Sequence, residues 1–365
     1  MSEAVPTITK RPLGKTGLEV SIVGFGGIKL PKVEEAEAVR AVQRALDLGL
    51  NFIDTARNYG DSEAKIGRAL RGQRDQAIIA SKTVARDAEG AREHLETSLR
   101  ELGVDVIDLY QLHSVSDEQV WRQVMAPGGA LSGLERARQE GKIRHIGITQ
   151  HRAIETMRKA IESGRFETIM VAYSVLDQEG VGPEILPLAQ KHKMGVIVMK
   201  GLSGGLIASA PDRPRPPGPD PVVIGALRHI VSHLAVTTVI PGITCVREIE
   251  EDAAVARDFQ PMTDDEREEL ISALADLRRE FRYGQVCLQC GYCQPCPNGI
   301  PIPAVFRAVW MHLQYPDELK PMGAALYRSL EVKPDVCEQC RKCEERCPAG
   351  IAIPERLAEA VELFE

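Results

Sequence analysis

Residues 51–63 of the chain read NFIDTARNYGDSE, and this stretch decides the fold. A short apolar run carries Asp54 to the expected end of a strand, a polar loop with Tyr59 follows, and an amphipathic pattern starts near Ser62. A strand, a polar loop and a helix in this order place reactive side chains on an α/β scaffold. Because Asp54 and Tyr59 are five residues apart at such a junction, we expect both side chains to lean toward one point above the sheet.

The same unit recurs on both sides of this stretch, because short β-branched runs alternate with helical periods up to about residue 258. Eight strands separated by helices are typical of a (β/α)8 barrel, for which about 250 residues is the usual length. A doubly wound sheet is the alternative, but no GxGxxG follows the first expected strand, so the barrel is favoured. The expected strands are residues 20–25, 51–54, 77–82, 107–112, 143–149, 168–173, 195–199 and 237–240.

Other segments add detail to this barrel. Residues 11–18, RPLGKTGL, predict a small hairpin across the barrel floor. Residues 203–221 contain too many prolines and glycines for a helix or a paired strand, so we expect a loop after the seventh strand, on the rim where barrels carry their active sites. Helices with an apolar stripe and a charged back are expected at residues 34–48, 88–102 and 154–163.

The composition limits the class of protein. A chain of 365 residues exceeds what one core usually holds, so a large domain and a smaller one are expected. A net charge of −7 and a pI near 5.8 give no basic footprint for nucleic acid. No apolar run approaches the roughly 20 residues of a membrane span, and the first residues lack the apolar core of a signal peptide. We therefore expect a cytoplasmic protein with neither a membrane nor a nucleic acid as partner.

Eight of the nine cysteines crowd between Cys287 and Cys347, which indicates a local metal or redox centre. The second cysteine run, CEQCRKCEERCP, has the C-x2-C-x2-C-x3-C-P spacing of bacterial ferredoxins, and the first, CLQCGYCQPCP, is the same pattern shortened by one residue. In such paired motifs the fourth cysteine usually ligates the other cluster. The expected ligand sets are therefore Cys287, Cys290, Cys293 and Cys347, and Cys337, Cys340, Cys343 and Cys296.

Structural zinc is the alternative for this region, since CxxC pairs also form sites with four cysteines. Four cysteines in each run, with Pro297 or Pro348 after the last, favour two [4Fe–4S] clusters. Disulfides in a cytoplasmic protein are the weakest choice. The spacer, residues 302–330, carries two helical patterns and resembles that of the α-helical ferredoxins, in which helices hold the two clusters.

Two further strand ends supply Lys82, in IIASK, and His113, in LYQLH. Tyrosine ordinarily titrates near pH 10, but an adjacent lysine ammonium favours the phenolate and lowers the pKa of the phenol. We expect Asp54 to hold Lys82 charged and aimed, and His113 to donate a hydrogen bond to a substrate carbonyl. Tyr59 would then protonate the carbonyl oxygen as a hydride reaches the carbon. Each residue alone has an ordinary structural explanation, and the four together indicate a mechanism.

Over residues 10–258 the sequence resembles the aldo/keto reductases. RPLGKTGLEVSIVGFGG resembles their opening strand, FIDTARNYGDSE their loop with Asp and Tyr, LYQLH their histidine strand, GKIRHIGIT their fifth strand and VIPGIT their eighth. The resemblance implies a (β/α)8 barrel that binds NADP(H) without a Rossmann motif, with Asp54, Tyr59, Lys82 and His113 as its catalytic tetrad.

With its cysteines, the whole chain resembles the branch of that family fused to a C-terminal ferredoxin-type domain. The domains expected are a barrel at residues 1–258, a linker helix at 259–284 and a small, mostly α-helical ferredoxin-like iron–sulfur domain at 285–365.

The resemblance also indicates where the nucleotide binds. Where the family often has Ser-Asn after its fifth strand, this chain has Thr149-Gln150, and Met170 and Met199 replace the usual glutamine and aromatic residue of the sixth and seventh strands. Arg247 is the best cation for a 2′-phosphate, which favours NADPH over NADH. The expected nucleotide contacts are Thr149, Gln150, Met170, Met199, Gly201, Leu202, Gly204, Gly242, Thr244 and Arg247.

Three functions are open from the sequence. The first is an NADP(H)-dependent reductase of a small carbonyl substrate, whose ferredoxin domain exchanges electrons with a redox partner, senses oxidation or is structural. The second is an electron-transfer enzyme whose clusters deliver single electrons to a substrate or a flavin at the barrel mouth; the chain has no flavin motif, though barrels can bind FMN through loops that carry none. The third is a redox-responsive binding module, which has no need of all four tetrad groups.

Overall fold

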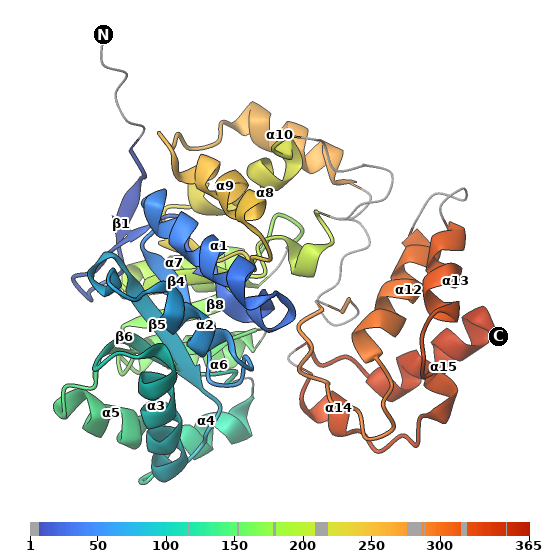
Figure 1. Ribbon diagram of the computed structural model, residues 1–365, viewed down its shortest axis with the longest axis horizontal. Coiled ribbons are helices and arrows are strands. Elements are labelled where there is room, and N and C mark those ends of the chain that lie inside the picture. The colour runs from blue at the N-terminus through green and yellow to red at the C-terminus, as the bar shows by residue number, and fades with distance from the viewer. Residues whose placement is uncertain are drawn as a thin grey trace. The chain divides into compact units, whose positions relative to one another are not determined.

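The computed structural model of the chain describes residues 7–115, 117–151, 153–177, 180–208, 218–275, 286–287, 289–314, 320–347 and 349–365. By its internal contacts the chain divides into two compact units, Met1–Gly201 with Pro221–Leu274, and Leu202–Asp220 with Ala275–Glu365. In the described part of the chain every strand belongs to the first unit, and the second unit is built from helices (Figure 1).

The first unit is a closed barrel. Its eight strands follow the order β10-β9-β8-β7-β6-β5-β4-β3, and the neighbours pair in parallel. Bridges from Val23 to Val239 and from Gly26 to Gly242 join the first strand to the last. The predicted (β/α)8 barrel is therefore confirmed. Its strands are β3 Phe25–Gly26, β4 Phe52–Asp54, β5 Ile78–Thr83, β6 Ile107–Leu112, β7 Ile143–Gln150, β8 Thr168–Ala172, β9 Gly195–Met199 and β10 Thr238–Val239.

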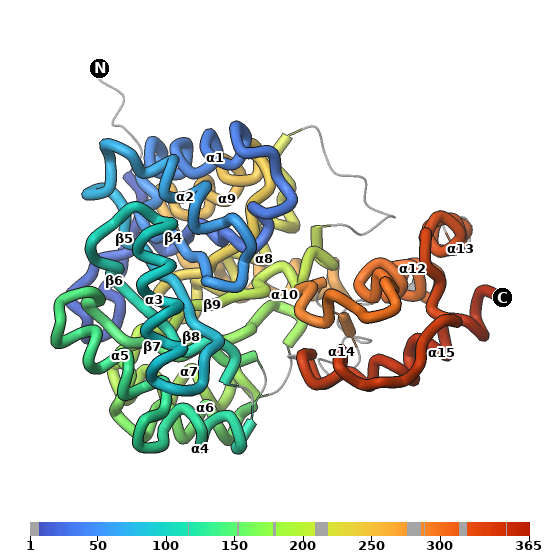
Figure 2. Tube along the Cα trace, turned by 60° about the horizontal axis from the view of Figure 1, so that its bottom comes forward, coloured from blue at the N-terminus to red at the C-terminus, as the bar shows by residue number. Residues whose placement is uncertain are grey.

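Helices surround the sheet, as Figure 1 and Figure 2 show. The ring closes where α9 lies beside α1, far from it in sequence, with Arg44 Nε donating to Glu250 at 2.9 Å. The predicted helices at 34–48, 88–102 and 154–163 correspond to α1, α3 and α6. The helices of this unit are α1 Glu35–Asp47, α2 Ser62–Ala69, α3 Ala88–Leu102, α4 Glu118–Met125, α5 Ala130–Gln139, α6 Ile154–Glu162, α7 Leu186–Lys191, α8 Pro221–Ser232, α9 Val246–Ala256 and α10 Asp264–Ala273.

The floor hairpin forms as predicted. Strand β1, Lys10–Pro12, pairs antiparallel with β2, Glu19–Ser21. Gly14, in the turn, has φ +57°, and a Cβ there would lie 2.2 Å from the backbone nitrogen of Gly195, the first residue of β9. The hairpin thus packs at the amino end of β9.

The predicted first strand, residues 20–25, was wrong in its extent. The chain divides it, because the segment up to Ser21 pairs with the hairpin and only Phe25 and Gly26 pair with β4. Most other strand ends fall within one residue of the prediction. Part of the predicted 259–284 helix is α10, and residues 276–285 lie outside the described residues. No helix among the described residues has the length and apolar character needed to cross a membrane.

The second unit has a small apolar core of its own, formed by residues such as Ile302, Val305, Tyr327 and Leu357. Cys293 and Cys343 belong to the same core, so its thiols face apolar packing. Of the proline-rich segment at 203–221, the structure describes residues 203–208 and 218–221. The helices of the unit are η4 Ser203–Gly205, α12 Ile302–Gln314, α13 Lys320–Arg328, η5 Pro334–Val336, α14 Lys342–Glu345 and α15 Ile353–Phe364.

Candidate active site

The candidate active site lies at the carboxyl ends of the barrel strands. Asp54 is the last residue of β4, Lys82 lies near the end of β5, and His113 follows the end of β6. Tyr59 lies in the loop between β4 and α2. Because the strands are parallel neighbours, their carboxyl ends share one rim. The structure brings all four residues together there.

A buried ion pair is the centre of the site. Lys82 Nζ donates to Asp54 Oδ2 at 2.7 Å, and the two side chains are only 1% and 3% exposed. Lys82 Nζ also donates to the Thr55 carbonyl at 2.6 Å. Burial raises the pKa of Asp54 and lowers the pKa of Lys82, while the charge of each partner opposes that effect on the other. Each residue thus keeps its partner charged and in place.

The Tyr59 ring lies between this ammonium and an imidazole. Lys82 Nζ is 4.9 Å from the centroid of the Tyr59 ring. The rings of Tyr59 and His113 meet edge to face, with centroids 5.7 Å apart and planes at 76°. Tyr59 is largely buried, with 8% of its surface exposed. The phenol therefore has a cation and a hydrogen-bonding ring as its immediate neighbours.

Backbone hydrogen bonds hold the loop that carries Tyr59. The Thr55 N–H donates to the Ala80 carbonyl at 2.8 Å, and the Arg57 N–H donates to the Lys82 carbonyl at 3.0 Å, so the loop continues the pairing of β4 with β5. Ser62, the first residue of α2, donates its hydroxyl to the Gly27 carbonyl at 2.9 Å. The loop is tied at both ends, which fixes where the phenol lies.

The His113 imidazole is neutral at neutral pH. Burial lowers its pKa well below the usual value, and the positive charges of Lys82, Arg86 and Lys200 lower it further. A neutral imidazole can donate a hydrogen bond, but it has no extra proton to release. Of the Tyr59 phenol and the His113 imidazole, the phenol is therefore the better acid.

Two residues expected to contact the nicotinamide, Thr149 and Gln150, already form hydrogen bonds within the chain. The Thr149 hydroxyl accepts from the Ser114 N–H at 2.9 Å, and Gln150 Nε2 donates to the Val115 carbonyl at 2.9 Å. Among the described residues, Gln150 Oε1 is buried and has no hydrogen-bond partner. Met170 lies beside Thr149 across β7 and β8, and both it and Met199, at the end of β9, are buried. A buried acceptor with no partner among the described residues suits the NH2 group of a carboxamide.

The expected phosphate contacts have partners within the chain. The Thr244 N–H and hydroxyl both donate to the Glu248 carboxylate, at 2.7 and 2.8 Å. The N–H of Val246, which begins α9, donates to Glu37 at 3.1 Å. Two carboxylates therefore already occupy the donors that a phosphate would use, and a phosphate at Thr244 would have to displace Glu248.

The other expected nucleotide residues belong to both units. Gly242, in the loop before α9, and Arg247, in its first turn, are both exposed. Gly201 packs on the barrel, since a Cβ there would lie 2.9 Å from Ile230 and 3.0 Å from Val239. Leu202 and Gly204 belong to the second unit by their contacts, and Gly204 has φ +72°.

Three basic residues of this rim were missed in the sequence. His151 and Lys200 directly follow the ends of β7 and β9, and Arg86 lies beyond the end of β5. Burial lowers the pKa of His151 to about 3, and the charges of Lys200 and Lys82 add to this effect. Arg86 donates to the carbonyls of His113 and Ser114, at 2.8 and 3.1 Å. A polar residue directly after a buried strand is the signal that could have found His151 and Lys200.

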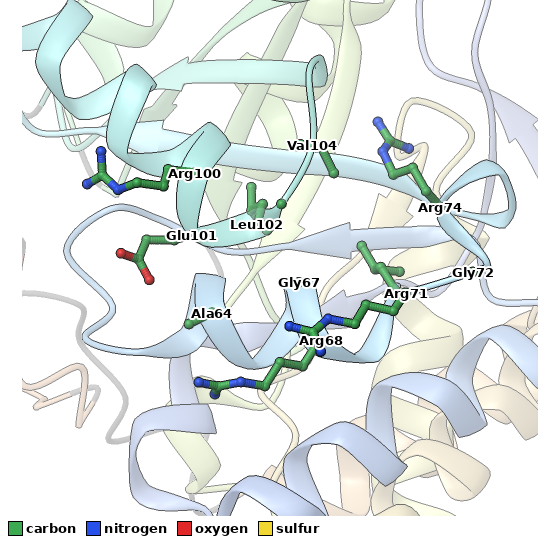
Figure 3. Close-up of a pocket in the computed structure, with 12 residues that line it drawn as sticks. Ala64, Gly67, Arg68, Arg71, Gly72, Arg74, Arg100, Glu101, Leu102 and Val104 are labelled. Carbon is green, nitrogen blue, oxygen red and sulfur yellow. The ribbon is translucent and has the colours of Figure 1, made fainter.

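A pocket of about 340 Å³ lies at the opposite end of the barrel, between the last turns of α2 and α3 (Figure 3). Arg68, Arg71 and Arg100 line it, at helix ends where cations offset the negative end of the dipole. Arg74 and Val104, also in its wall, precede β5 and β6. The pocket is therefore at the amino ends of these strands and is separate from the candidate active site.

The cysteines of the second unit gather in two groups. Burial, together with nearby Cys287, Cys290 and Cys347, raises the pKa of Cys293 to about 12. Burial also raises the pKa of Cys343, and its neighbours include Cys337 and Cys296. These neighbours belong to the predicted ligand sets, with the fourth cysteine of each run beside the other run. Cys340 is exposed. Among the described residues, no three His, Cys, Asp or Glu side chains are arranged to hold a metal ion.

The two cysteine runs share a backbone conformation. Gln289 and Gln339, at equivalent positions, have φ of +53° and +52°, and the residues two further on, Gly291 and Arg341, have φ of +79° and +57°. A left-handed conformation is costly for glutamine and arginine, and such strain persists at functional sites where the surroundings enforce it. The two runs therefore share one local backbone conformation.

Known proteins resemble the barrel part of the chain. The model of the aldo/keto reductase family matches residues 22–223, which include the four rim residues and none of the eight clustered cysteines. The chain is 30% identical over 216 residues to the uncharacterized oxidoreductase YqkF of Bacillus subtilis, covering 55% of this chain and 67% of that protein. It is 27% identical over 292 residues to L-galactose dehydrogenase of Arabidopsis thaliana, covering 70% of this chain and 90% of that protein.

Solved structures share the barrel. The holo form of the aldo-keto reductase AKR11C1 from Bacillus halodurans is 28% identical, with a TM-score of 0.62, over 73% of this chain and 96% of that one. The aldo/keto reductase from Klebsiella pneumoniae in complex with NADP and acetate is 23% identical, with a TM-score of 0.58, over 71% of this chain and 93% of that one. The second likeness shows the fold alone.

Proposed function

Since the chain belongs to the aldo/keto reductase family and is an oxidoreductase of that type, we propose that it reduces small carbonyl compounds with NADP(H), using Tyr59 as the general acid. The observation that carries this proposal is the buried Lys82–Asp54 ion pair, 2.7 Å long, beneath the Tyr59 ring. A buried ion pair is weak evidence for stability, since replacing such a pair by apolar residues is often neutral. The buried Lys82–Asp54 pair is better explained by a role in proton transfer from Tyr59.

The charges at the rim favour proton release from Tyr59. The Lys82 ammonium stabilises the phenolate that forms when Tyr59 gives its proton to a carbonyl oxygen. Asp54 accepts a hydrogen bond from Lys82 and so keeps the ammonium charged and aimed. The neutral His113 imidazole donates a hydrogen bond to the carbonyl oxygen and holds it near the phenol.

NADP(H) fits the other side of the site. The nicotinamide, when bound, supplies a hydride. Gln150 Oε1, a buried acceptor with no partner among the described residues, would accept from the carboxamide, and Met170 and Met199 would pack against the ring. Arg247 remains the proposed cation for a 2′-phosphate, which favours NADPH over NADH.

We further propose that the second unit holds two [4Fe–4S] clusters and acts as a ferredoxin-like domain. The neighbourhoods of Cys293 and Cys343, each of which includes a cysteine of the other run, and the repeated left-handed backbone of the two runs support this assignment. When bound, such clusters exchange single electrons. The chain would hold one with Cys287, Cys290, Cys293 and Cys347, and the other with Cys337, Cys340, Cys343 and Cys296. Assays of iron and acid-labile sulfide on protein purified without oxygen test this part: about eight of each per chain are expected, and stoichiometric zinc would overturn it.

Tyr59→Phe tests the catalytic proposal. We expect kcat for NADPH-dependent reduction of a panel of aldehydes to fall about 10²- to 10⁴-fold, the usual contribution of a general acid. The dissociation constant of NADPH and the iron content should be unchanged. Tyr110→Phe is the matched control, since Tyr110 is a buried barrel tyrosine that pairs with Ser98 at 3.2 Å and has no part in the site. An unchanged kcat in Tyr59→Phe would refute the proposal that Tyr59 is the general acid.

A further inference from the structure

Basic residues follow three barrel strands at the active rim. His113, His151 and Lys200 come directly after β6, β7 and β9. These strands are separated by only β8 in the sheet order. The three residues therefore form an arc on the rim that holds the Asp54–Lys82 pair.

The charge of this arc at neutral pH is that of Lys200, because the lowered pKa values of His113 and His151 leave both imidazoles neutral. Asp54 forms an ion pair with Lys82, and Arg86 donates hydrogen bonds to the carbonyls of His113 and Ser114. Lys200 forms no hydrogen bond or ion pair among the residues that the structure describes. Its charge nevertheless lowers the pKa of both buried histidines, so it lies close to them.

The backbone of Lys200 is also unusual. It has φ +61°, a left-handed conformation that lysine rarely adopts, and it is half-buried. A residue held in such a conformation at a rim, with an unpaired charge, is expected where a ligand supplies the missing partner.

We propose that Lys200, with His151 beside it, binds a carboxylate carried by the carbonyl substrate, so that the enzyme reduces aldehydes or ketones that are also acids. The inference rests on the proposed reductase function and names the class of its substrate. A lysine ammonium is a point charge suited to a carboxylate or a phosphate. Because Lys200 lies near His113, which faces the reacting oxygen, the carboxylate of the substrate is favoured over a phosphate of the dinucleotide.

The test compares 4-oxobutanoate with its uncharged methyl ester as substrates of Lys200→Met. We expect kcat/KM for 4-oxobutanoate to fall about 10- to 100-fold, the range for a hydrogen bond to a charged group, and kcat/KM for the ester to stay within about twofold. Lys200→Arg should keep part of the preference for the acid. Lys193→Met is the matched control, since Lys193 is also left-handed, with φ +53°, but precedes β9 at the opposite end of the barrel.

Two results would overturn the inference. One is an equal loss for acid and ester. The other is a dissociation constant of NADPH that rises by the same factor in Lys200→Met, which would assign the lysine to a phosphate of the dinucleotide.

Failure of the reductase proposal gives a different outcome. If the wild-type protein reduces neither aldehyde, calorimetric titration measures the dissociation constant of succinate for the wild type and for Lys200→Met, and so tests the anion site without catalysis. Succinate should bind the wild type at least about tenfold more tightly, and equal affinities would reject the site.

Discussion

Replacing Asp54 by asparagine tests whether the buried ion pair has the energetic role that the site assigns to it. The change keeps the shape of the side chain and removes its charge. Lys82 then keeps its hydrogen bond to the Thr55 carbonyl, 2.6 Å long, but loses the carboxylate that compensates its buried ammonium.

The magnitude follows from the separation of the charges. Unit charges 2.7 Å apart attract by about 6 kcal/mol at an effective dielectric constant of about 20. Part of this is offset in the folded protein by the cost of desolvating both groups, and breaking one partner of a buried pair typically destabilises by about 3–5 kcal/mol. We expect the free energy of unfolding of the barrel to fall by that amount in Asp54→Asn at pH 7.

The loss should depend on pH. Burial lowers the pKa of Lys82 in the folded protein, and without Asp54 no carboxylate opposes this shift. Between that lowered pKa and the ordinary value near 10.4, the unfolded chain binds more protons than the folded one, so the free energy of unfolding rises with pH. The defect of Asp54→Asn should therefore shrink as the pH is raised from 7 toward 10.

Urea denaturation measures the effect, with Trp121 fluorescence as the barrel signal in a Trp310→Phe background that silences the tryptophan of the second unit. Asp61→Asn is the control, because Asp61 also pairs with a buried lysine, Lys65, at 2.9 Å but is itself 55% exposed. That change should cost less than about 1 kcal/mol. Equal losses in the two variants, or an Asp54→Asn defect that grows with pH, would refute the reasoning.

Three further outcomes are expected. Gln150→Leu should raise the dissociation constant of NADPH about tenfold by removing one hydrogen-bond acceptor, as measured by fluorescence titration, and an unchanged constant would remove Gln150 from the nucleotide site. Cys347→Ser should impair the cluster held mainly by the first cysteine run, and Cys296→Ser the cluster held mainly by the second, so EPR spectra of the reduced variants should lack different cluster signals. If each variant lost the cluster of the run that contains the mutated cysteine, the crossed ligation would be disproved. Arg346→Met should lower the iron retained per chain. Arg346 links the two runs, because it donates to the carbonyls of Cys293, Gln294 and Pro295 at 3.0–3.1 Å. The control Arg356→Met removes only an exposed pair with Glu359 and should leave the iron content unchanged.

The positions of the strands could be predicted from the sequence, because buried parallel strands give short apolar runs at regular intervals. The same pattern located Asp54, Lys82 and His113, each at or next to a strand end. The division of the first strand could not be predicted, because residues 22–26 continue as one segment without a polar residue after pairing with the hairpin ends at Ser21.

The nucleotide contacts were harder to predict, because they depend on which donors the folded chain already uses. Thr244 looked available in the sequence, yet Glu248, four residues along the same helix start, takes both its donors. His151 and Lys200 each directly follow a buried strand, which is a local signal, but their proximity to His113 arises only when the barrel closes.

The crossed grouping of the cysteines needed the spacing of both runs, whereas the repeated left-handed residues could be seen only in the backbone. Glutamine and arginine give no sign in the sequence that they adopt a conformation typical of glycine.

The most direct test of the central claim follows deuterium from NADPH labelled at the transferring C4 position into the product of 4-oxobutanoate reduction. Hydride transfer with Tyr59 as acid predicts that the label appears on the carbinol carbon, with a rate at least about twofold slower than for unlabelled NADPH when hydride transfer limits turnover. Product whose new C–H hydrogen comes from solvent, formed while the cluster EPR signals appear, would contradict the account and assign the reduction to single electrons delivered through the second unit.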